Sequence, residues 1–561
     1  MRREVSVVNK KVCSFPILFA LLALVVGTCA VVFPASAQAA PTSTGSITVS
    51  GTVASSYDAY QIFSANVVDG DSDAKIATDL TWASDAACDA ALPVLHSAGM
   101  PNSQTTAQEA AEWLNTDSHL TSALSAQLAR SLQSSGAVFV ALNAGTAAEL
   151  HCGYWLIVAD DDAIAQGEVG TAPIMALVGG SAVTVKPKAA TPKVSKHVLE
   201  DGTAAWQKAA DATVADDLYW RLSATVPAGL TAYDTYTVRF VDTMSAGLDP
   251  SKVAASMRVY VAAGADGGFD AVSTGKDGRA GTEPAKGWTD ITAQCGVSVD
   301  GKTFTVRTGD LIAALGGADA FAAGARVVAV YNAPLNSACN HGIAKGNPNE
   351  VYLRYPRSPF TDQSGDAGFA RTPSDDACAY TWDLALTKRG SDGDKPLAGA
   401  VLSIADDHGR TLAADGTWDA EGKATVTTGE DGRVTVSGVD SGKLEVRELK
   451  APKGYNAFEG TRSVTVKAEG LDVDQVAAAK PKLTITAESP LRADSADGLT
   501  GSLEASLINT PTGTPPSITT GGFMPSTGDM AMYAAAAAAV AGAALIVVAL
   551  LVKRGGGSHK E

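Results

Sequence analysis

The stretch Leu-Glu-Val-Arg-Glu-Leu-Lys-Ala-Pro-Lys-Gly-Tyr, Leu444–Tyr455, indicates a β-rich fold for the C-terminal part of the chain. Its first residues, Leu444–Glu448, alternate apolar and charged side chains, as a half-buried strand does. Working outward, Trp382–Lys388 is the predicted opening strand of this region and Leu503–Asn509 its last. We therefore predict a β-domain over residues 376–511.

A second β-rich region, residues 186–375, precedes it. Asp300-Gly301 is a hairpin turn signal between two short alternating runs. Thr372–Asp376, rich in small and polar residues, is predicted to be the linker to the next domain. The predicted strands of this region are Tyr236–Val241, Val297–Val299, Thr303–Val306, Arg326–Tyr331 and Val351–Tyr355.

Residues 41–185 are predicted to form an α+β domain. Ser46–Val53 alternates as a strand, and Gly153–Ala159 is an apolar run typical of a buried strand. Between them, Thr106–Gln133 has helical spacing, and Thr106 with Glu109 forms a capping-box signature.

Composition limits the function. The 561 residues are enough for three or four domains, and the net charge of −17 makes nucleic acid an unsuitable partner. The histidines are scattered without metal-ligand spacing, and no phosphate loop or hydrolase motif occurs. We therefore expect no cofactor, no metal site and no enzyme activity on an external substrate.

Residues 1–40 resemble a secretory signal peptide. A basic start is followed by the apolar stretch Phe15–Phe33 and the small-residue cleavage site Ala35-Ser36-Ala37. In an exported protein disulfides can persist, so Cys88 with Cys152 and Cys295 with Cys339 are possible pairs, which leaves Cys378 as a buried free thiol.

Residues 512–561 combine a proline-containing linker, a short motif and an apolar run. The motif is Met524-Pro525-Ser526-Thr527-Gly528, and Met532–Val552 behind it is long enough to cross a bilayer before a basic tail. This combination resembles the cell-wall sorting signal of Gram-positive surface proteins, with Met524 in place of the usual Leu. The resemblance implies a transient membrane anchor, cleavage between Thr527 and Gly528 by a sortase, and attachment of the new acyl end to an amine.

Further motifs resemble the sortase-assembled backbone pilins of Gram-positive bacteria. Val183-Thr-Val-Lys-Pro-Lys188 is similar to their pilin motif, with Lys186 in place of Tyr. Leu444–Tyr455 resembles the E-box of collagen-adhesin B-type modules. Tyr57–Phe63, Phe240–Leu248, Gly346–Tyr355 and Leu386–Leu402 resemble other parts of these proteins. The resemblance implies a mainly β fold, with tandem immunoglobulin-like β-sandwich domains after the α+β domain.

The same resemblance implies that subunits are joined covalently. The Thr527 carbonyl of one copy would be attacked by the Lys188 amine of the next, with Lys186 and Lys193 as less favoured acceptors. The implied partners are pilus and housekeeping sortases, identical subunits and peptidoglycan. The alternative function is a wall-anchored or pilus-tip adhesin that binds a host surface ligand and needs no acceptor lysine.

The family also forms internal amide bonds between a lysine and an asparagine beside a buried acid. In the C-terminal domain the implied residues are Lys388, Asn509 and, as the acid, Glu448. Parallel opening and closing strands would bring the first two together.

In the middle domain the implied lysine is Lys196 and the acid is Asp242, whereas the family's usual asparagine after the last strand is missing. Either Asn349 or Asn347 substitutes for it, or this domain forms no internal bond. In the first domain Lys75 is the single lysine, and we predict no bond there.

Overall fold

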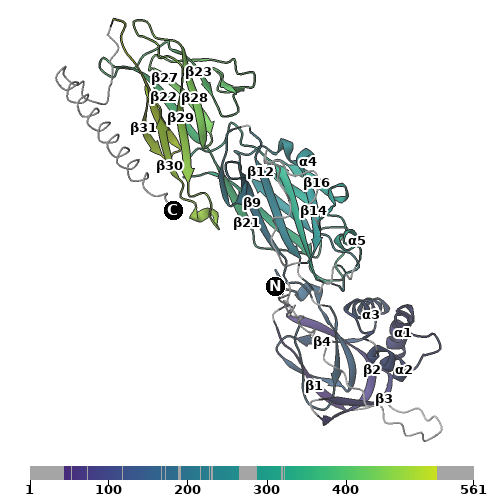
Figure 1. Ribbon diagram of the computed structural model, residues 1–561. Coiled ribbons are helices and arrows are strands. Elements are labelled where there is room, and N and C mark those ends of the chain that lie inside the picture. The colour runs from purple at the N-terminus through teal and green to yellow at the C-terminus, as the bar shows by residue number, and fades with distance from the viewer. Residues whose placement is uncertain are drawn as a thin grey trace, which may run out of the picture.

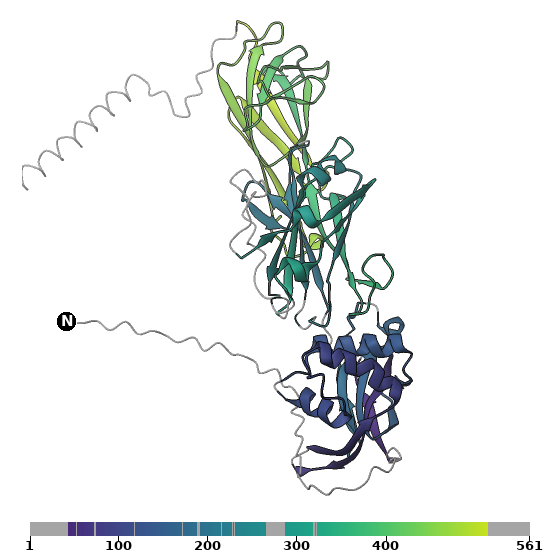
Figure 2. The same ribbon diagram turned by 90° about the vertical axis from the view of Figure 1, so that its right-hand side faces the viewer.

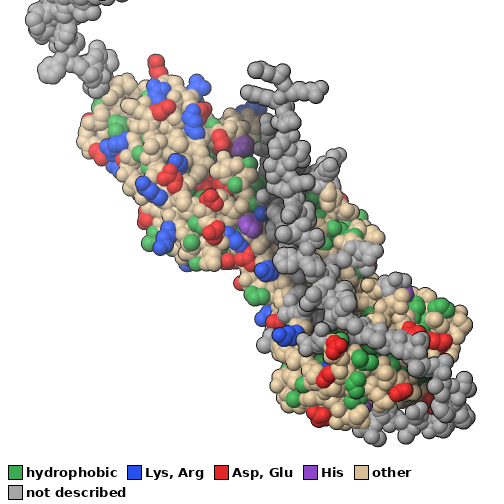
Figure 3. Space-filling view, turned by 60° about the horizontal axis from the view of Figure 1, so that its bottom comes forward, with side chains coloured by type: hydrophobic (Ala, Val, Ile, Leu, Met, Phe, Trp, Pro, Cys, Tyr) green, Lys and Arg blue, Asp and Glu red, His purple; other side chains and the backbone are tan. Residues whose placement is uncertain are grey.

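The computed structural model describes residues 43–513, apart from residues 52, 72–73, 117, 166, 171, 188–190, 215, 227, 229–230, 265–286, 318–319 and 321–322. The described chain is mainly β and forms three regions that follow one another along an elongated body, which both Figure 1 and Figure 2 show. On the face shown in Figure 3, basic and acidic side chains lie intermixed.

The first region is a sheet buried on both faces. Strands β3-β2-β6-β7 form its main path, and β6 is buried at every position because helices cover one face and the small sheet β5-β1-β8 covers the other. This double burial explains the unbroken apolar run predicted as a strand. The elements are β1 Thr44–Val49, β2 Ser56–Asp69, β3 Lys75–Trp82, α1 Asp85–Ser97, α2 Ala107–Asn115, α3 Ser122–Ser135, β4 Phe139–Asn143, β5 Ala147–His151, β6 Gly153–Ala159, β7 Ile174–Val178 and β8 Val183–Val185.

The predicted helical stretch of this region is divided into α2 and α3. The predicted capping box is present, because Thr106 Oγ1 accepts from the Glu109 amide and the Glu109 carboxylate accepts from the Thr106 amide. Helix α1, which carries Pro93 in its interior, was not predicted from the sequence.

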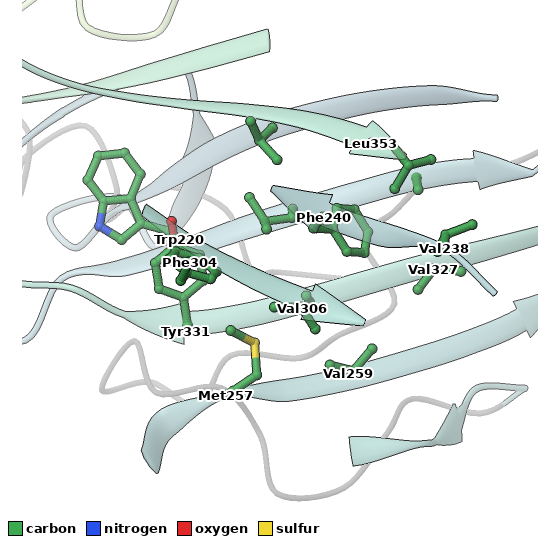
Figure 4. Close-up of a cluster of buried hydrophobic side chains, with 14 of the residues drawn as sticks. Trp220, Val238, Phe240, Met257, Val259, Phe304, Val306, Val327, Tyr331 and Leu353 are labelled. Carbon is green, nitrogen blue, oxygen red and sulfur yellow. The ribbon is translucent and has the colours of Figure 1, made fainter. Parts of the chain in front are cut away.

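The middle region is a sandwich of two sheets. One has the order β10-β9-β12-β18-β14-β15 and the other β11-β21-β19-β13-β17-β16, and their inner faces share one apolar core (Figure 4). The elements are β9 Lys193–Glu200, β10 Ala205–Gln207, β11 Ala209–Asp211, β12 Tyr219–Val226, β13 Arg239–Met244, α4 Val253–Ser256, β14 Arg258–Ala263, β15 Thr289–Asp290, β16 Gly296–Asp300, β17 Thr303–Arg307, α5 Leu311–Ala314, β18 Ala325–Asn332, β19 Asn347–Pro356, β20 Phe369–Arg371 and β21 Asp375–Tyr380.

Two predictions for this region have different outcomes. The hairpin turn is confirmed, since β16 and β17 pair in antiparallel register and Gly301 has φ +58°. The predicted linker Thr372–Asp376 is wrong at its end, because Asp375 and Asp376 already belong to β21, which pairs with β19. The middle sandwich therefore extends to Tyr380.

The C-terminal region is also a two-sheet sandwich. Its sheets have the orders β27-β22-β32-β31 and β25-β24-β23-β28-β29-β30 and enclose a second core, which also includes Ala209, Cys378 and Tyr380 of the middle region. The elements are β22 Trp382–Gly390, β23 Val401–Ala405, β24 Thr411–Leu412, β25 Trp418–Asp419, β26 Val426–Thr427, β27 Arg433–Val439, β28 Gly442–Lys450, β29 Thr461–Glu469, β30 Lys482–Ala487, β31 Leu491–Asp497 and β32 Ser502–Asn509.

The middle and C-terminal sandwiches meet at a buried aspartate. Asp211 Oδ2 accepts from Trp382 Nε1 at 2.6 Å, from the Ser441 amide at 2.9 Å and from Ser441 Oγ at 2.6 Å. Glu200 lies beside it and accepts from the Asp211 amide at 3.2 Å. Burial and the neighbouring acids raise the pKa of Glu200 to about 8, and they raise the pKa of Asp440 far above its usual range. The junction therefore includes two carboxyl groups, those of Glu200 and Asp440, whose pKa values are raised.

Candidate functional site

Three polar side chains meet inside the C-terminal sandwich. Lys388 lies on β22 and Asn509 ends β32, whereas Glu448 comes from β28 of the opposite sheet. Strands β22 and β32 are parallel, as expected, with Lys388 opposite Leu507 and Gly390 opposite Asn509. The chain thus brings together a lysine and an asparagine that are 121 positions apart.

The contacts within this cluster are direct. Lys388 Nζ donates to Asn509 Oδ1 and lies 3.1 Å from Glu448 Oε1. Asn509 Nδ2 donates to Glu448 Oε1 at 2.9 Å and to Oε2 at 3.0 Å. Glu448 Oε2 also accepts from the Phe458 amide at 3.1 Å, which fixes the carboxyl group. One oxygen, Glu448 Oε1, therefore touches both the lysine nitrogen and the amide nitrogen.

Burial changes the charge preference of the lysine. Its side chain is fully shielded from solvent, and desolvation lowers the pKa of Lys388 to about 8 although Glu448 opposes the shift. The neutral amine is the nucleophilic form, and at neutral pH a lowered pKa makes it a larger fraction of Lys388 than of an exposed lysine. The arrangement can support attack of an amine on a side-chain amide.

A second buried lysine lies in the middle sandwich. Lys196 on β9 donates to Asp242 Oδ2 of β13, and both side chains have no exposed surface. Asn349 lies on β19, adjacent to β13, and is also fully buried. Desolvation lowers the pKa of Lys196 to about 8 and raises the pKa of Asp242, so burial favours the neutral form of each.

Tyr331 of β18 connects these groups, and it was not among the residues predicted from the sequence. Its hydroxyl accepts from Lys196 Nζ at 2.9 Å and from Asn349 Nδ2 at 2.8 Å, and donates to Asp242 Oδ2 at 3.0 Å. The available signal was its position in the predicted strand, because side chains two residues apart share a strand face and Tyr331 therefore lies on the same face as the core residues Val327 and Ala329.

The structure separates the two candidate asparagines. Asn347 Nδ2 donates to the carbonyls of Asn340 at 2.9 Å and Ala379 at 3.2 Å, and its Oδ1 accepts from the Asn340 amide. Asn347 thus closes a loop and has no described contact with Lys196. Asn349 is the asparagine that the fold brings to the lysine cluster, through Tyr331.

Lys75, at the start of β3, occupies a different kind of environment. Its Nζ donates to the carbonyls of Gly179 and Ser181 and lies 3.3 Å from Asp69. Its Nζ also donates to the Ser181 hydroxyl at 3.1 Å, and the described contacts of this nitrogen include no side-chain amide.

All five described cysteines are free in this structure, so neither of the two possible pairs, Cys88 with Cys152 and Cys295 with Cys339, is joined in it. Cys88 lies on helix α1, whereas Cys152 is buried where β5 meets β6. Cys295 Sγ donates to the Ile291 carbonyl at 3.3 Å, and Cys339 Sγ lies 3.6 Å from His341 Nε2, so each has a different local partner. Cys378 is buried, as predicted.

One group of described residues has the spacing of metal ligands. Atoms of Asp406, Asp407 and His408 lie within 4.8 Å of one another. Asp406 already accepts from Arg410 Nε at 2.6 Å, and the other two side chains are exposed. We therefore assign no metal to this turn.

Several predicted residues lie outside the described part of the chain. These are the signal peptide, Lys188, the motif Met524–Gly528 and the apolar run 532–552. Among the residues that are described, no helix has the length and apolar character needed to cross a membrane. Lys186, two positions before Lys188, follows β8 and is exposed.

Comparison with known proteins agrees with the sequence motifs. Residues 383–480 match the family described as SpaA, a prealbumin-like fold domain. The trypsin-resistant surface T6 protein of Streptococcus pyogenes serotype M6 is 30% identical over 143 residues, which are 24% of this chain and 24% of that protein. The chain therefore aligns with about a quarter of the length of this curated relative.

Three solved structures of backbone or major pilins align with most of this chain. The T6 backbone pilin of serotype M6 Streptococcus pyogenes aligns with TM-score 0.45 at 17% identity, over 85% of this chain and 100% of the other. The full-length major pilin SpaD from Corynebacterium diphtheriae aligns with TM-score 0.40 at 16% identity, over 85% and 100%. BcpA, the major pilin subunit of Bacillus cereus, aligns with TM-score 0.38 at 12% identity, over 84% and 99%. Residues 383–480 therefore match the SpaA prealbumin-like domain, and a stretch of 143 residues is similar to the T6 surface protein.

Proposed function

We propose that this chain is the major structural subunit of a covalent pilus on a Gram-positive cell. A sortase would join the Thr527 carbonyl of one copy to the Lys188 amine of the next, and the finished fibre would be anchored to peptidoglycan. The SpaA domain, the T6 relative and the order of motifs along the chain support this function. The role is structural and needs no catalysis on an external substrate.

For the sortase reaction the subunit needs to supply only an exposed lysine. An exposed lysine has a pKa near 10.4 and is mostly protonated at neutral pH, so the sortase must assist deprotonation. The pilin has only to present the amine. Lys188 follows the last strand of the first region and precedes β9, at the junction of two domains. The neighbouring Lys186 is exposed, which supports an accessible acceptor segment.

We further propose that Lys388 and Asn509 form an internal amide bond. The neutral Lys388 amine attacks Asn509 Cγ, and Glu448 takes part in the proton transfers. Glu448 Oε1 lies 3.1 Å from the attacking nitrogen and 2.9 Å from the leaving nitrogen, so one oxygen can pass a proton from one to the other as ammonia departs. Contact between amine and amide supplies an effective molarity of about 10⁵ M or more.

The observation that carries this proposal is the burial of an amine, an amide and an acid in mutual contact on the first, last and middle strands of a SpaA-type domain. Burying a charged lysine and a charged carboxylate that never form a bond would destabilise the fold, because moving each ion out of water costs several kcal/mol. Their burial is explained if the cluster matures into a neutral amide.

The polymer is tested by the size of the subunit on the cell surface. We expect the wild-type chain, extracted from cell walls and separated in hot detergent, to give a ladder of multimers. Lys188→Ala should collapse the ladder to one band, whereas the matched control Lys186→Ala should retain it. A ladder that survives Lys188→Ala would contradict the acceptor assignment, and no ladder from wild type would favour the adhesin.

The internal bonds are tested by intact mass under denaturing conditions. Each internal bond releases one ammonia, so the wild-type chain should weigh less than its sequence predicts. In Lys388→Ala the ammonia of the C-terminal bond should not be lost. In the middle domain we propose a bond between Lys196 and Asn349, with Asp242 as the acid. The loss of a second ammonia would support Asn349 as the partner, whereas loss of water would indicate that Lys196 had attacked Asp242 instead.

A further inference from the structure

The two lysine clusters differ in how they connect the attacking and leaving nitrogens. In the C-terminal domain a carboxyl oxygen, Glu448 Oε1, contacts both. In the middle domain no described hydrogen bond joins Asp242 to Asn349. The atom that contacts both nitrogens there is the hydroxyl oxygen of Tyr331, at 2.9 Å from Lys196 Nζ and 2.8 Å from Asn349 Nδ2.

The tyrosine is held firmly in this place. Its side chain is fully buried, and its ring packs edge-on against Phe304 with centroids 4.7 Å apart. Figure 4 shows Trp220 beside these two rings, at one end of the apolar core. A ring fixed by packing on several sides keeps its hydroxyl oriented, as a group that handles a proton must be.

The electrostatic setting keeps the tyrosine a neutral hydroxyl. Burial raises its pKa far above the ordinary value, so it does not ionise, and a hydroxyl can donate and accept at once. Its hydrogen is directed to Asp242 Oδ2 at 3.0 Å in the resting arrangement. Two further oxygens, Asp242 Oδ1 and Asn349 Oδ1, are buried without a hydrogen-bond partner. The cluster therefore retains unused acceptor capacity around the amide.

We propose that Tyr331 is a catalytic residue of the middle domain, which carries the proton from the attacking Lys196 nitrogen to the leaving Asn349 nitrogen. This inference rests on the proposed internal bond between those two residues. Asp242 then serves to hold the lysine and the hydroxyl, and the proton transfer that Glu448 performs in the C-terminal domain is performed by Tyr331.

The step balances in atoms and protons. The bond from Lys196 Nζ to Asn349 Cγ forms, and the bond from Cγ to Nδ2 breaks. One hydrogen of Nζ moves to the Tyr331 oxygen while the hydroxyl hydrogen moves to Nδ2, which leaves as ammonia. Tyr331 and Asp242 end in the protonation states in which they began, so no co-reactant is required.

The test compares the mature chain with a Tyr331→Phe variant, which keeps the ring. After purification, the branched peptide that joins Lys196 to Asn349 is quantified against time by digestion and mass spectrometry. General acid–base assistance contributes about 100-fold or more, so we expect bond formation to slow by at least that factor. Tyr355→Phe is the matched control, because Tyr355 is a buried tyrosine on β19 whose hydroxyl has no hydrogen-bond partner.

A second arm covers the case in which Tyr331→Phe fails to fold. Fluorotyrosine keeps both ring and hydroxyl but makes the hydroxyl more acidic, so it should change the rate of the middle-domain bond. The Lys388–Asn509 bond, whose cluster contains no tyrosine, should form at its normal rate in the same molecule.

The possible outcomes distinguish the role of Tyr331 from the existence of the Lys196–Asn349 bond. An unchanged rate of the middle-domain bond in Tyr331→Phe or with fluorotyrosine would overturn the role of Tyr331 while leaving the bond itself in place. Absence of any branched peptide from the wild-type chain, or loss of water with Asp242 as partner, would overturn the proposed bond and the tyrosine role with it.

Discussion

Replacement of Glu448 by Gln should separate the fold of the C-terminal domain from its cross-link. Gln has nearly the same volume but is not an acid, so we expect Lys388 and Asn509 to remain unjoined. The cross-link closes a loop of 121 positions, and a closed loop of that length restricts the unfolded chain by about 5 kcal/mol. For a domain of this size each kcal/mol shifts the melting temperature by about 3 °C, so the variant should melt on the order of 15 °C lower.

Two measurements on the full mature chain check this expectation. Intact mass should show one ammonia more in Glu448→Gln than in wild type, and calorimetry should show one transition moved down. Glu445→Gln is the matched control, because Glu445 lies on the same strand, is exposed and pairs with Lys443 at 2.9 Å. Because this pair is exposed and screened by solvent, its loss should leave the melting temperature close to that of wild type. A Glu448→Gln chain that loses the ammonia and melts with wild type would refute the acid role.

Three further predictions concern the rest of the molecule. The pKa of Glu200 is raised from 4.5 to about 8, so between these pH values the folded state holds a proton that the unfolded state has released. The free energy of unfolding should therefore fall as the pH rises through this window. Melting temperatures of Glu200→Gln, measured against pH, should show a flatter dependence than those of wild type. Gly432→Ala should destabilise the C-terminal domain, because Gly432 has φ +74° and an added Cβ would lie 2.8 Å from the Lys388 carbonyl oxygen. Intact mass should then show a smaller cross-linked fraction. The control Gly416→Ala, with φ +85° and open space around the added Cβ, should cost only the backbone strain of about 1 kcal/mol. A thiol reagent added to the unfolded mature chain without reductant should titrate five cysteines, and a lower number would show that disulfides form.

The C-terminal cluster could be predicted from the sequence because its three residues lie on strands whose order along the chain carries the geometry. Opening and closing strands that run parallel bring Lys388 to Asn509, and alternation along β28 turns Glu448 inward toward them. The local sequence pattern and the family motif both indicate these residues, so the sequence was sufficient to identify the cluster.

The middle cluster could be predicted only in part, for a physical reason. Tyr331 lies near the end of the apolar strand β18, where the sequence gives it the character of one more core residue. Its role arises because β9, β13, β18 and β19 meet at this point. Likewise, β21 begins in a polar segment that resembles a linker and becomes a strand because β19 and β11 pair with it. Pairing between distant segments is not encoded in local composition.

The parallel pairing of β22 with β32 has a topological consequence once its lysine and asparagine are joined. Residues 388–509 then form a covalent ring, with the remainder of the protein attached as two arms. A protease that cuts once in an exposed turn of this ring, such as the one at Gly416, leaves both ends tethered. Only a second cut within the ring, or a cut in an arm, releases a fragment, so a nicked filament would keep its length.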